Sequence, residues 1–165
     1  MKHTVLLSYL QQYHIPYILH EHEPIFTCND GEHLKSVIPG RHNKNLFLSD
    51  PKGMLFLITV LDSKRVDLKA LALQLNCKRF SFASAEELFA RLQVLPGSVT
   101  PYGLMFNSAK NISYYIDEDV MASEWVNFHP LRNDMTLSLK PVDFIQFLEI
   151  VGHPLKTLQI PEKLG

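Results

Sequence analysis

The stretch "KNLFLSDPKGMLFLITVL", residues 44–61, constrains the fold more than any other part of the chain. Two apolar runs flank a short segment that contains Asp50, Pro51 and Gly53, and these residue types favour tight turns. Two apolar runs with such a turn between them predict a β-hairpin. We therefore expect a sheet in which at least these two strands are antiparallel.

Further helices and strands are predicted around this hairpin by side-chain periodicity, capping residues and turn residues. The predicted helices cover residues 1–13, 28–37, 67–75, a segment that opens at Ser84, and a last helix from Pro141 that stops at Gly152. The predicted strands cover residues 17–23, 79–83, 111–117, 124–129 and 135–139. Because many strands follow one another through short turns, we expect an α/β (α+β) fold with a mixed or largely antiparallel sheet surrounded by helices.

Two expectations concern the C-terminal part. The apolar positions predicted for the last helix are Val142, Ile145, Phe147, Leu148 and Val151. The tail "KTLQIPEKLG" that follows has mixed polarity and an internal proline, so it is expected to lie on the surface.

The length and composition indicate a globular protein. The 165 residues fit one domain that spans residues 1–165, with 46% hydrophobic and 20% charged residues. The formal net charge of −1 means that any surface attracting nucleic acid must be local. No apolar run reaches the roughly 18 residues of a membrane span, and the N-terminus lacks a secretory signal. Cys28 and Cys77 are isolated, which excludes a disulfide framework and a CxxC metal pair, and we expect a cytoplasmic protein.

One segment of the chain carries only basic charges. Residues 33–49 contain no acid, whereas Lys35, Arg41 and Lys44 are present together with two histidines. Such a patch can hold phosphate oxygens of a nucleic acid. The alternative is a solvated surface run that acids elsewhere in the fold balance.

Lys44 opens the first strand of the hairpin and is followed by an amide, Asn45. A lysine in this position can contact a phosphate or polarise a carbonyl oxygen, and the asparagine adds a donor. The alternative is an edge-strand lysine that discourages aggregation.

The segment "LPGSVTPYG", residues 95–103, is predicted to be a loop of fixed shape, because it holds two prolines and two glycines. It lacks the GxxxxGK[ST] pattern of a nucleotide-binding loop. Exposed backbone N–H groups near Gly97 can stabilise an oxyanion without any side-chain chemistry. A purely structural loop is the alternative.

The histidines leave several possibilities open. His129 stands directly before a proline at the end of a predicted strand, either as a hydrogen-bonded structural residue or as part of a site. His20 and His22 would point to the same side of a strand, but no third metal ligand follows at a recognisable spacing. The chain contains neither GxSxG nor HExxH, so the common hydrolase motifs are absent.

Taken in order, seven segments resemble the YbaK/prolyl-tRNA-synthetase editing-domain superfamily, and within it the free-standing prolyl-tRNA editing proteins. They extend from about His20 to Pro154 and are "HEHEPIFT", "IPGRHNKNLFLSD", "VDLKAL", "FSFASAEEL", "LPGSVTPYGL", "FHPLRNDMT" and "DFIQFLEIVGHP". The resemblance implies an α/β domain with a mixed, partly barrel-like sheet. It also implies hydrolysis of the ester that links a wrong amino acid to the terminal ribose of tRNA, most often alanine on proline tRNA, with no metal or organic cofactor.

The resemblance also implies roles for particular residues. Lys44, Gly97 and His129 match the functional lysine, the GxxxP loop and the pocket histidine of the family. Substrate contacts are then expected from Asn45, Ser98, Val99, Thr100, Pro101, Asn133 and Thr136. Contacts to the acceptor end of tRNA are expected from Lys35, Arg41 and Lys44. A transient association with prolyl-tRNA synthetase is a further expected partnership, and no membrane is expected.

Three positions depart from the family pattern and put the amino-acid preference in doubt: Asn107, Asp134 and Met135. The alternatives are the same chemistry on Cys- or Ser-tRNA, and a non-catalytic tRNA-binding module that retains the fold. A regulatory protein-interaction domain is a third alternative, and it would require an exposed apolar patch.

Overall fold

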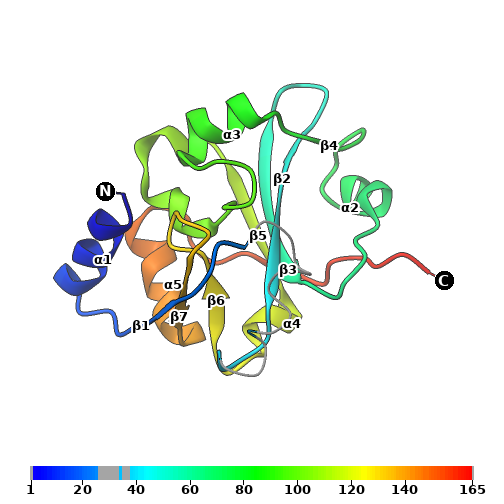
Figure 1. Cartoon of the computed structure of the whole chain (residues 1–165). Coiled ribbons are helices and arrows are strands. Elements are labelled where there is room, and N and C mark those ends of the chain that lie inside the picture. Colours follow the sequence, from blue (N-terminus) through cyan, green and yellow to red (C-terminus); the bar gives the residue numbers. More distant parts are fainter. Residues whose placement is uncertain (1, 26–33, 35–37, 165) are drawn as a thin grey trace.

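A five-stranded mixed sheet forms the centre of the molecule in the computed structural model, which describes residues 2–25, 34 and 38–164. Its strand order is β4-β2-β3-β5-β8 (Figure 1). Strands β2 (Asn43–Ser49) and β3 (Leu55–Leu61) form the predicted antiparallel hairpin, and β4 (Ser81–Phe82) extends it antiparallel to β2. On the other side, β5 (Ser113–Asp117) and β8 (Thr157–Leu158) are parallel to β3.

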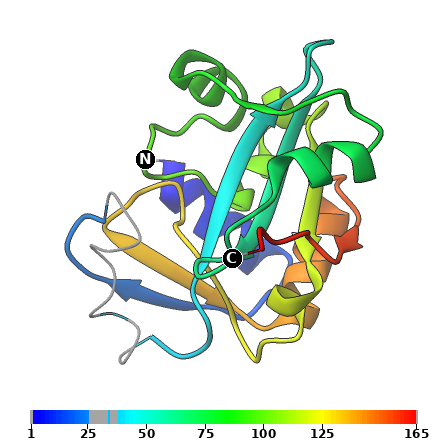
Figure 2. The same ribbon diagram turned by 90° about the vertical axis from the view of Figure 1, so that its right-hand side faces the viewer.

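A second, three-stranded sheet has the order β1-β7-β6 and is antiparallel throughout. It consists of β1 (Ile18–Glu21), β6 (Val126–Phe128) and β7 (Met135–Leu139). In Figure 2 its strands run across the direction of β2. The mixed α/β fold expected from the sequence is confirmed, and over the described residues the two sheets stay separate and are not closed into a barrel.

Helices cover both sheets. The longer ones are α1 (Lys2–Gln12), α3 (Ala85–Leu92) and α5 (Pro141–Ile150), and the shorter ones are α2 (Leu68–Gln74) and α4 (Glu118–Met121). The two predicted caps are confirmed, because Asp67 accepts from the N–H of Ala70 and Ser84 accepts from the N–H of Glu87. No helix in the described part of the chain is long and apolar enough to cross a membrane.

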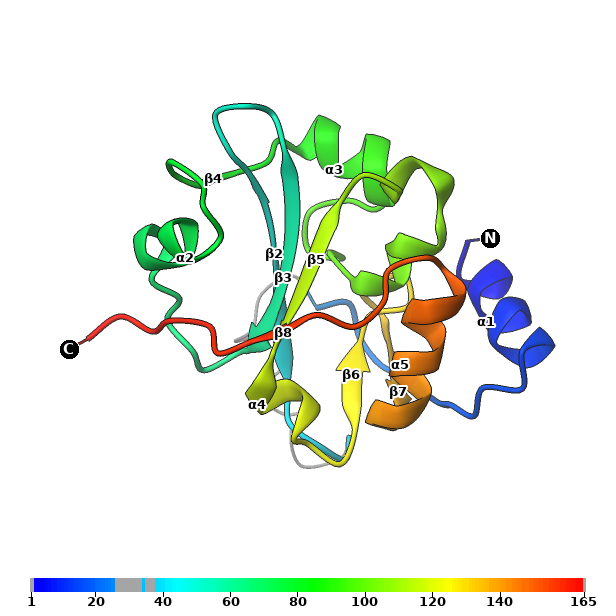
Figure 3. The ribbon, with the colours of Figure 1, turned by 180° about the vertical axis from the view of Figure 1, so that it is seen from behind.

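Strand β3 is buried on both faces and separates two parts of the core. Leu55, Leu57 and Leu61 face a large cluster with α1, α3, α5 and the three-stranded sheet. Phe56 and Ile58, on the opposite face, pack with α2 and the C-terminal segment. Figure 3 shows α5 beside the three-stranded sheet and the C-terminal segment running past β5.

Four details differ from the sequence-based expectations. The tail is not simply a surface segment, because β8 pairs with β5 and Ile160 is only 1% exposed. Val142 is 68% exposed, and Phe144 fills the core position in α5 instead.

The end of the 95–103 loop is regular, since Pro101 begins the 3-10 helix η2 (Pro101–Met105), which is followed by η3 (Asn107–Ala109). Helix α4 had not been predicted, and the helix predicted over residues 28–37 lies, apart from Leu34, outside the described residues.

Candidate active site

A cavity of about 280 Å³ brings together three distant parts of the chain. Lys44 at the start of β2, Gly97 in the loop after α3 and His129 at the end of β6 all line it. The remaining lining residues are Ile25, Leu34, His42, Asn43, Asn45, Asp62, Val99, Asn127, Phe128 and Thr136. Ile25 and Leu34 form a small separate apolar cluster with Ile38, so the wall contains an apolar section beside the polar groups.

Strand β2 supplies Lys44 and Asn45 to the cavity. Successive side chains of a strand point to opposite faces, so the two residues reach the cavity from different sides of β2. Within the described part of the chain, the Lys44 ammonium forms no recorded ion pair or hydrogen bond. A half-buried ammonium without a protein partner is suited to bind an anionic or carbonyl oxygen of a ligand.

The loop contribution is a tight turn centred on Pro96 and Gly97. The N–H of Ser98 donates to the carbonyl of Leu95 at 3.0 Å, and Gly97 has φ +93°. Proline followed by a glycine with positive φ is typical of a type II turn. The turn occupies the Ser98 N–H, whereas over the described residues the N–H groups of Gly97 and Val99 have no recorded acceptor.

Two anchors hold this loop in place. The Asn45 side-chain amide donates to the carbonyl of Val99 at 3.2 Å. Immediately after the loop, Tyr102 is fully buried with its ring against Phe128 and Phe147, and its hydroxyl donates to the carbonyl of Leu137 at 3.2 Å. The backbone of the loop therefore keeps its shape without a ligand.

His129 presents a hydrogen-bond acceptor to the cavity. Its Nδ1 lies 2.8 Å from the carbonyl oxygen of Met135, and a carbonyl can only accept, so Nδ1 carries the proton. Burial lowers the pKa of His129, an effect that the hydrogen bond to Met135 opposes. The neutral ring then has Nε2 as an acceptor, on a residue that lines the cavity.

A second histidine fixes the neighbouring wall. His22 Nδ1 lies 2.7 Å from the carbonyl of Glu23, and His22 Nε2 lies 2.8 Å from the Thr136 hydroxyl. Because a carbonyl can only accept, His22 Nδ1 donates to Glu23, and Nε2 pairs with the Thr136 hydroxyl. The ring of His22 is 6.1 Å from that of His129, so the two imidazoles are neighbours, although only His129 lines the cavity.

Asn127 is a lining residue that sequence reasoning missed. It is 5% exposed in β6, and its amide donates to the carbonyls of Pro39 and Arg41 at 2.9 and 3.1 Å. A Cβ on Gly40, whose φ is +90°, would lie 2.9 Å from the Cβ of Trp125. Residues 39–41 therefore pack tightly onto β6, which fixes the entry to β2 beside Lys44. An asparagine inside an apolar strand was the available sequence signal.

Several predicted site residues do not line the cavity. Thr100 and Pro101 are buried and form the start of η2, where the Thr100 side chain accepts from the N–H of Tyr102. Ser98 is buried in the turn, and the carbonyl of Asn133 accepts from the N–H of Ile25. Arg41 is exposed at the entry to β2 but is not a lining residue, and Lys35 lies outside the described residues.

No group of three or more His, Cys, Asp and Glu side chains that could hold a metal ion occurs among the residues with described positions. His20 lies in β1 and His22 directly after its end, and both ring nitrogens of His22 already have protein partners. The cavity thus offers an ammonium, two N–H groups and a neutral imidazole. That combination can bind a polar ester and stabilise negative charge on its carbonyl oxygen.

Comparison with known proteins places this cavity in a functional context. The profile of the aminoacyl-tRNA editing domain family matches residues 22–147, which contain all the lining residues named above. Prolyl-tRNA synthetase associated domain-containing protein 1 of Xenopus laevis is 34% identical, over 90% of this chain and 90% of its own length. Prolyl-tRNA editing protein ProX of Acetoanaerobium sticklandii is 28% identical, over 94% and 95% of the two chains.

Solved structures share the fold. The crystal structure of a candidate trans-editing enzyme for prolyl tRNA synthetase superposes with a TM-score of 0.74 over 98% of each chain. Its sequence identity to this chain is 19%, so this likeness extends to the fold alone.

Proposed function

Because this chain belongs to the aminoacyl-tRNA editing domain family, we propose that it deacylates mischarged tRNA in trans, with Ala-tRNA(Pro) as its substrate. The observation that carries the proposal is the shared cavity of Lys44, Gly97 and His129. The names of the relatives, which refer to prolyl-tRNA editing and to prolyl-tRNA synthetase, support proline tRNA as the carrier.

The reaction needs no protein nucleophile. An aminoacyl ester beside a free ribose hydroxyl is already reactive, so the protein has to orient it and stabilise the developing oxyanion. Water attacks the carbonyl carbon and gives up a proton, the ester C–O bond breaks, and the departing ribose oxygen takes up a proton. The products are the free amino acid and the free ribose hydroxyl, and the neighbouring ribose hydroxyl can orient the water by a hydrogen bond. The N–H groups of Gly97 and Val99 are the donors for the oxyanion, a contribution of a few kcal/mol in comparable sites.

Lys44 anchors the terminal nucleotide of the tRNA. Its ammonium is positioned for a phosphate or ribose oxygen, since it has no protein partner in the described part of the chain. Arg41 is exposed just before β2 and extends the basic surface toward the acceptor end. The near-neutral net charge of the chain fits contact with the acceptor end alone.

His129 and Thr136 form the end of the cavity that receives the aminoacyl group. The α-ammonium of the amino acid donates to Nε2 of His129, whose Nδ1–H is held by Met135. Selection is by size. The synthetase pocket that binds proline disfavours the smaller alanine by only ~1–3 kcal/mol, so some tRNA is charged with alanine. The cavity of the editing protein is then a second pocket that admits alanine and excludes proline.

A deacylation panel tests the proposal. Ala-, Cys- and Ser-tRNA are incubated with the protein, and the loss of the aminoacyl ester is followed over time. We expect the fastest cleavage for Ala-tRNA(Pro). Faster cleavage of the Cys or Ser ester would reassign the substrate, whereas tRNA binding without turnover on any ester would make the protein a non-catalytic module. An association with prolyl-tRNA synthetase would be transient, and its test is co-sedimentation in the presence of tRNA.

A further inference from the structure

Thr59 is a buried hydroxyl behind the cavity. It lies on the otherwise apolar strand β3, is 0% exposed and pairs in register with Asn45 of β2. Thr59 does not line the cavity itself. Its hydroxyl donates to Asn45 Oδ1 at 2.6 Å, so a residue outside the cavity holds the side chain of one inside it.

Tyr114 continues this chain of hydrogen bonds on β5. Its hydroxyl lies 2.8 Å from Thr59 Oγ1, and Tyr114 is 2% exposed. A threonine hydroxyl has one proton, and Thr59 gives it to Asn45, so Tyr114 must donate to Thr59. Burial raises the pKa of Tyr114, which keeps this donor protonated.

The direction of these bonds fixes the Asn45 amide. Its Oδ1 accepts from Thr59, and its Nδ2 therefore faces the Val99 carbonyl at 3.2 Å. The flipped amide would place Oδ1 against the Val99 oxygen, two acceptors without a proton between them. From donor to acceptor, the hydrogen bonds run from Tyr114 to Thr59, from Thr59 to Asn45, and from Asn45 to the carbonyl of Val99 in the loop.

We infer that Thr59 and Tyr114 are positioning residues for hydrolysis, because they orient the Asn45 amide and through it hold the 95–100 loop in the shape that leaves the Gly97 and Val99 N–H groups open. This inference deepens the proposed function and rests on it. Neither residue touches the substrate. Both act through Asn45 on the backbone that receives the oxyanion.

The experiment compares Thr59→Val, which keeps the volume but removes the hydroxyl, with the matched control Thr59→Ser, which keeps the hydroxyl. We expect Thr59→Val to lower kcat for Ala-tRNA(Pro) by about 10-fold or more with KM unchanged, because oxyanion stabilisation acts in the transition state. Thr59→Ser should keep kcat within about 3-fold of the wild type, since the donor to Asn45 remains. Tyr114→Phe should fall between the two, because Thr59 can still donate to Asn45.

A second measurement does not depend on activity. In ¹⁵N NMR spectra, Thr59→Val should shift the side-chain NH₂ signals of Asn45 and the backbone signals of Gly97 and Val99, and Thr59→Ser should leave them near their wild-type positions. Unshifted signals in Thr59→Val overturn the inference, and so does a wild-type kcat in that variant. If the wild-type protein cleaves no aminoacyl-tRNA, the proposed function fails, and the spectra alone then decide whether Thr59 positions the loop.

Discussion

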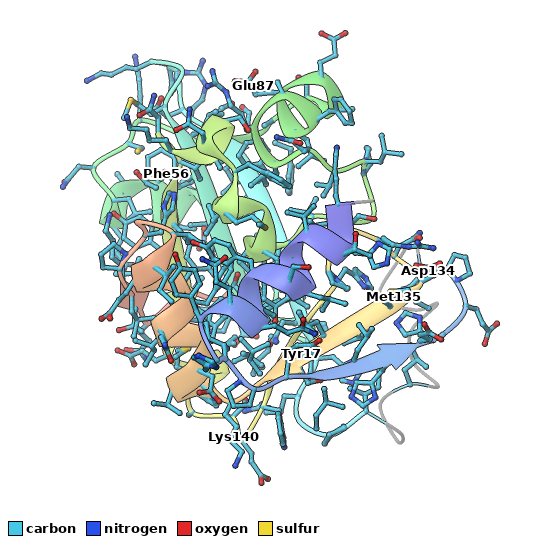
Figure 4. The ribbon with its side chains drawn as sticks, turned by 90° about the vertical axis from the view of Figure 1, so that its left-hand side faces the viewer. Tyr17, Phe56, Glu87, Asp134, Met135 and Lys140 are labelled. Atoms are coloured by element: carbon cyan, nitrogen blue, oxygen red, sulfur yellow. The ribbon has the colours of Figure 1, made fainter. Side chains whose placement is uncertain are left out.

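His129 Nδ1 donates to the carbonyl oxygen of Met135 across 2.8 Å, so the end of β6 is tied to the start of β7. Figure 4 labels Asp134 and Met135 at this end of the three-stranded sheet, beside β1. The bond fixes both the ring orientation and the tautomer. As a result Nε2 is the ring atom with an unshared pair, and the proposed contact to the substrate ammonium depends on it.

The pH dependence of the reaction follows from this tautomer. Burial lowers the pKa of His129 below its ordinary value of 6.5, so the ring is neutral at pH 7 and above. When the pH falls through that lowered pKa, Nε2 gains a proton and no longer accepts. We expect kcat/KM for Ala-tRNA(Pro) to fall on the acid side with a midpoint below 6.5. A His129→Gln variant should lack this limb, and an acid midpoint above 6.5 in the wild type would refute the assignment.

Removing the Lys44 ammonium should weaken the reaction at the binding stage. We expect Lys44→Ala to lower kcat/KM by about 10- to 100-fold. The slope of log tRNA affinity against log salt concentration should become smaller by about one, the change expected when one phosphate contact is lost. The matched control is Lys52→Ala, an exposed lysine in the β2–β3 turn that does not line the cavity. Near-wild-type kinetics in Lys44→Ala would remove this lysine from the mechanism.

Gly97 and Gly53 provide a matched pair for the loop. Both have positive φ, +93° and +80°, so an alanine strains the backbone by about 1–2 kcal/mol at either position. Gly53 lies in the hairpin turn, and a Cβ there would meet nothing within 4 Å. Both variants should lose similar stability, but only Gly97→Ala should lose kcat, by about 10- to 100-fold, with little change in tRNA binding. A loss of binding without loss of kcat would contradict the oxyanion role.

Stability depends on an ion pair that clamps the C-terminal segment. Lys64 Nζ lies 2.6 Å from Asp117 Oδ2 and donates to the carbonyl of Ile160 at 2.9 Å, and the Lys64 and Asp117 side chains are 10% and 1% exposed. Lys64→Ala leaves a buried carboxylate unpaired, which should lower the free energy of unfolding by roughly 3–5 kcal/mol. The exposed Lys69→Ala is the control and should change it by less than about 0.5 kcal/mol. Chemical denaturation measures both, and an equal effect would refute the clamp.

Local signals account for most of the predicted fold. The hairpin turn, the Asp67 and Ser84 caps and the proline at the start of α5 all act within a few residues, so the sequence displays them directly. The tail was different. The burial of Ile160 depends on the distant Lys64 and on pairing with β5, and no local pattern contains either contact.

The site was predictable only in part for the same reason. Taken singly, Lys44, Gly97 and His129 each have a structural alternative, and the family resemblance from about His20 to Pro154 is what groups them. The structure then places them in one cavity. Asn127 and Thr59 were missed because their importance comes from partners that are far away in sequence or on a neighbouring strand. A lone polar residue inside an apolar strand was the only sign of either.

The most direct measurement compares the hydrolysis of Ala-tRNA(Pro) and Pro-tRNA(Pro) by the wild-type protein. The two substrates are prepared from the same tRNA, charged with alanine in one sample and with proline in the other. A cavity that selects by size should cleave the alanyl ester at least about 100-fold faster than the prolyl ester. Equal cleavage of the two esters, or no cleavage of either, would contradict the account.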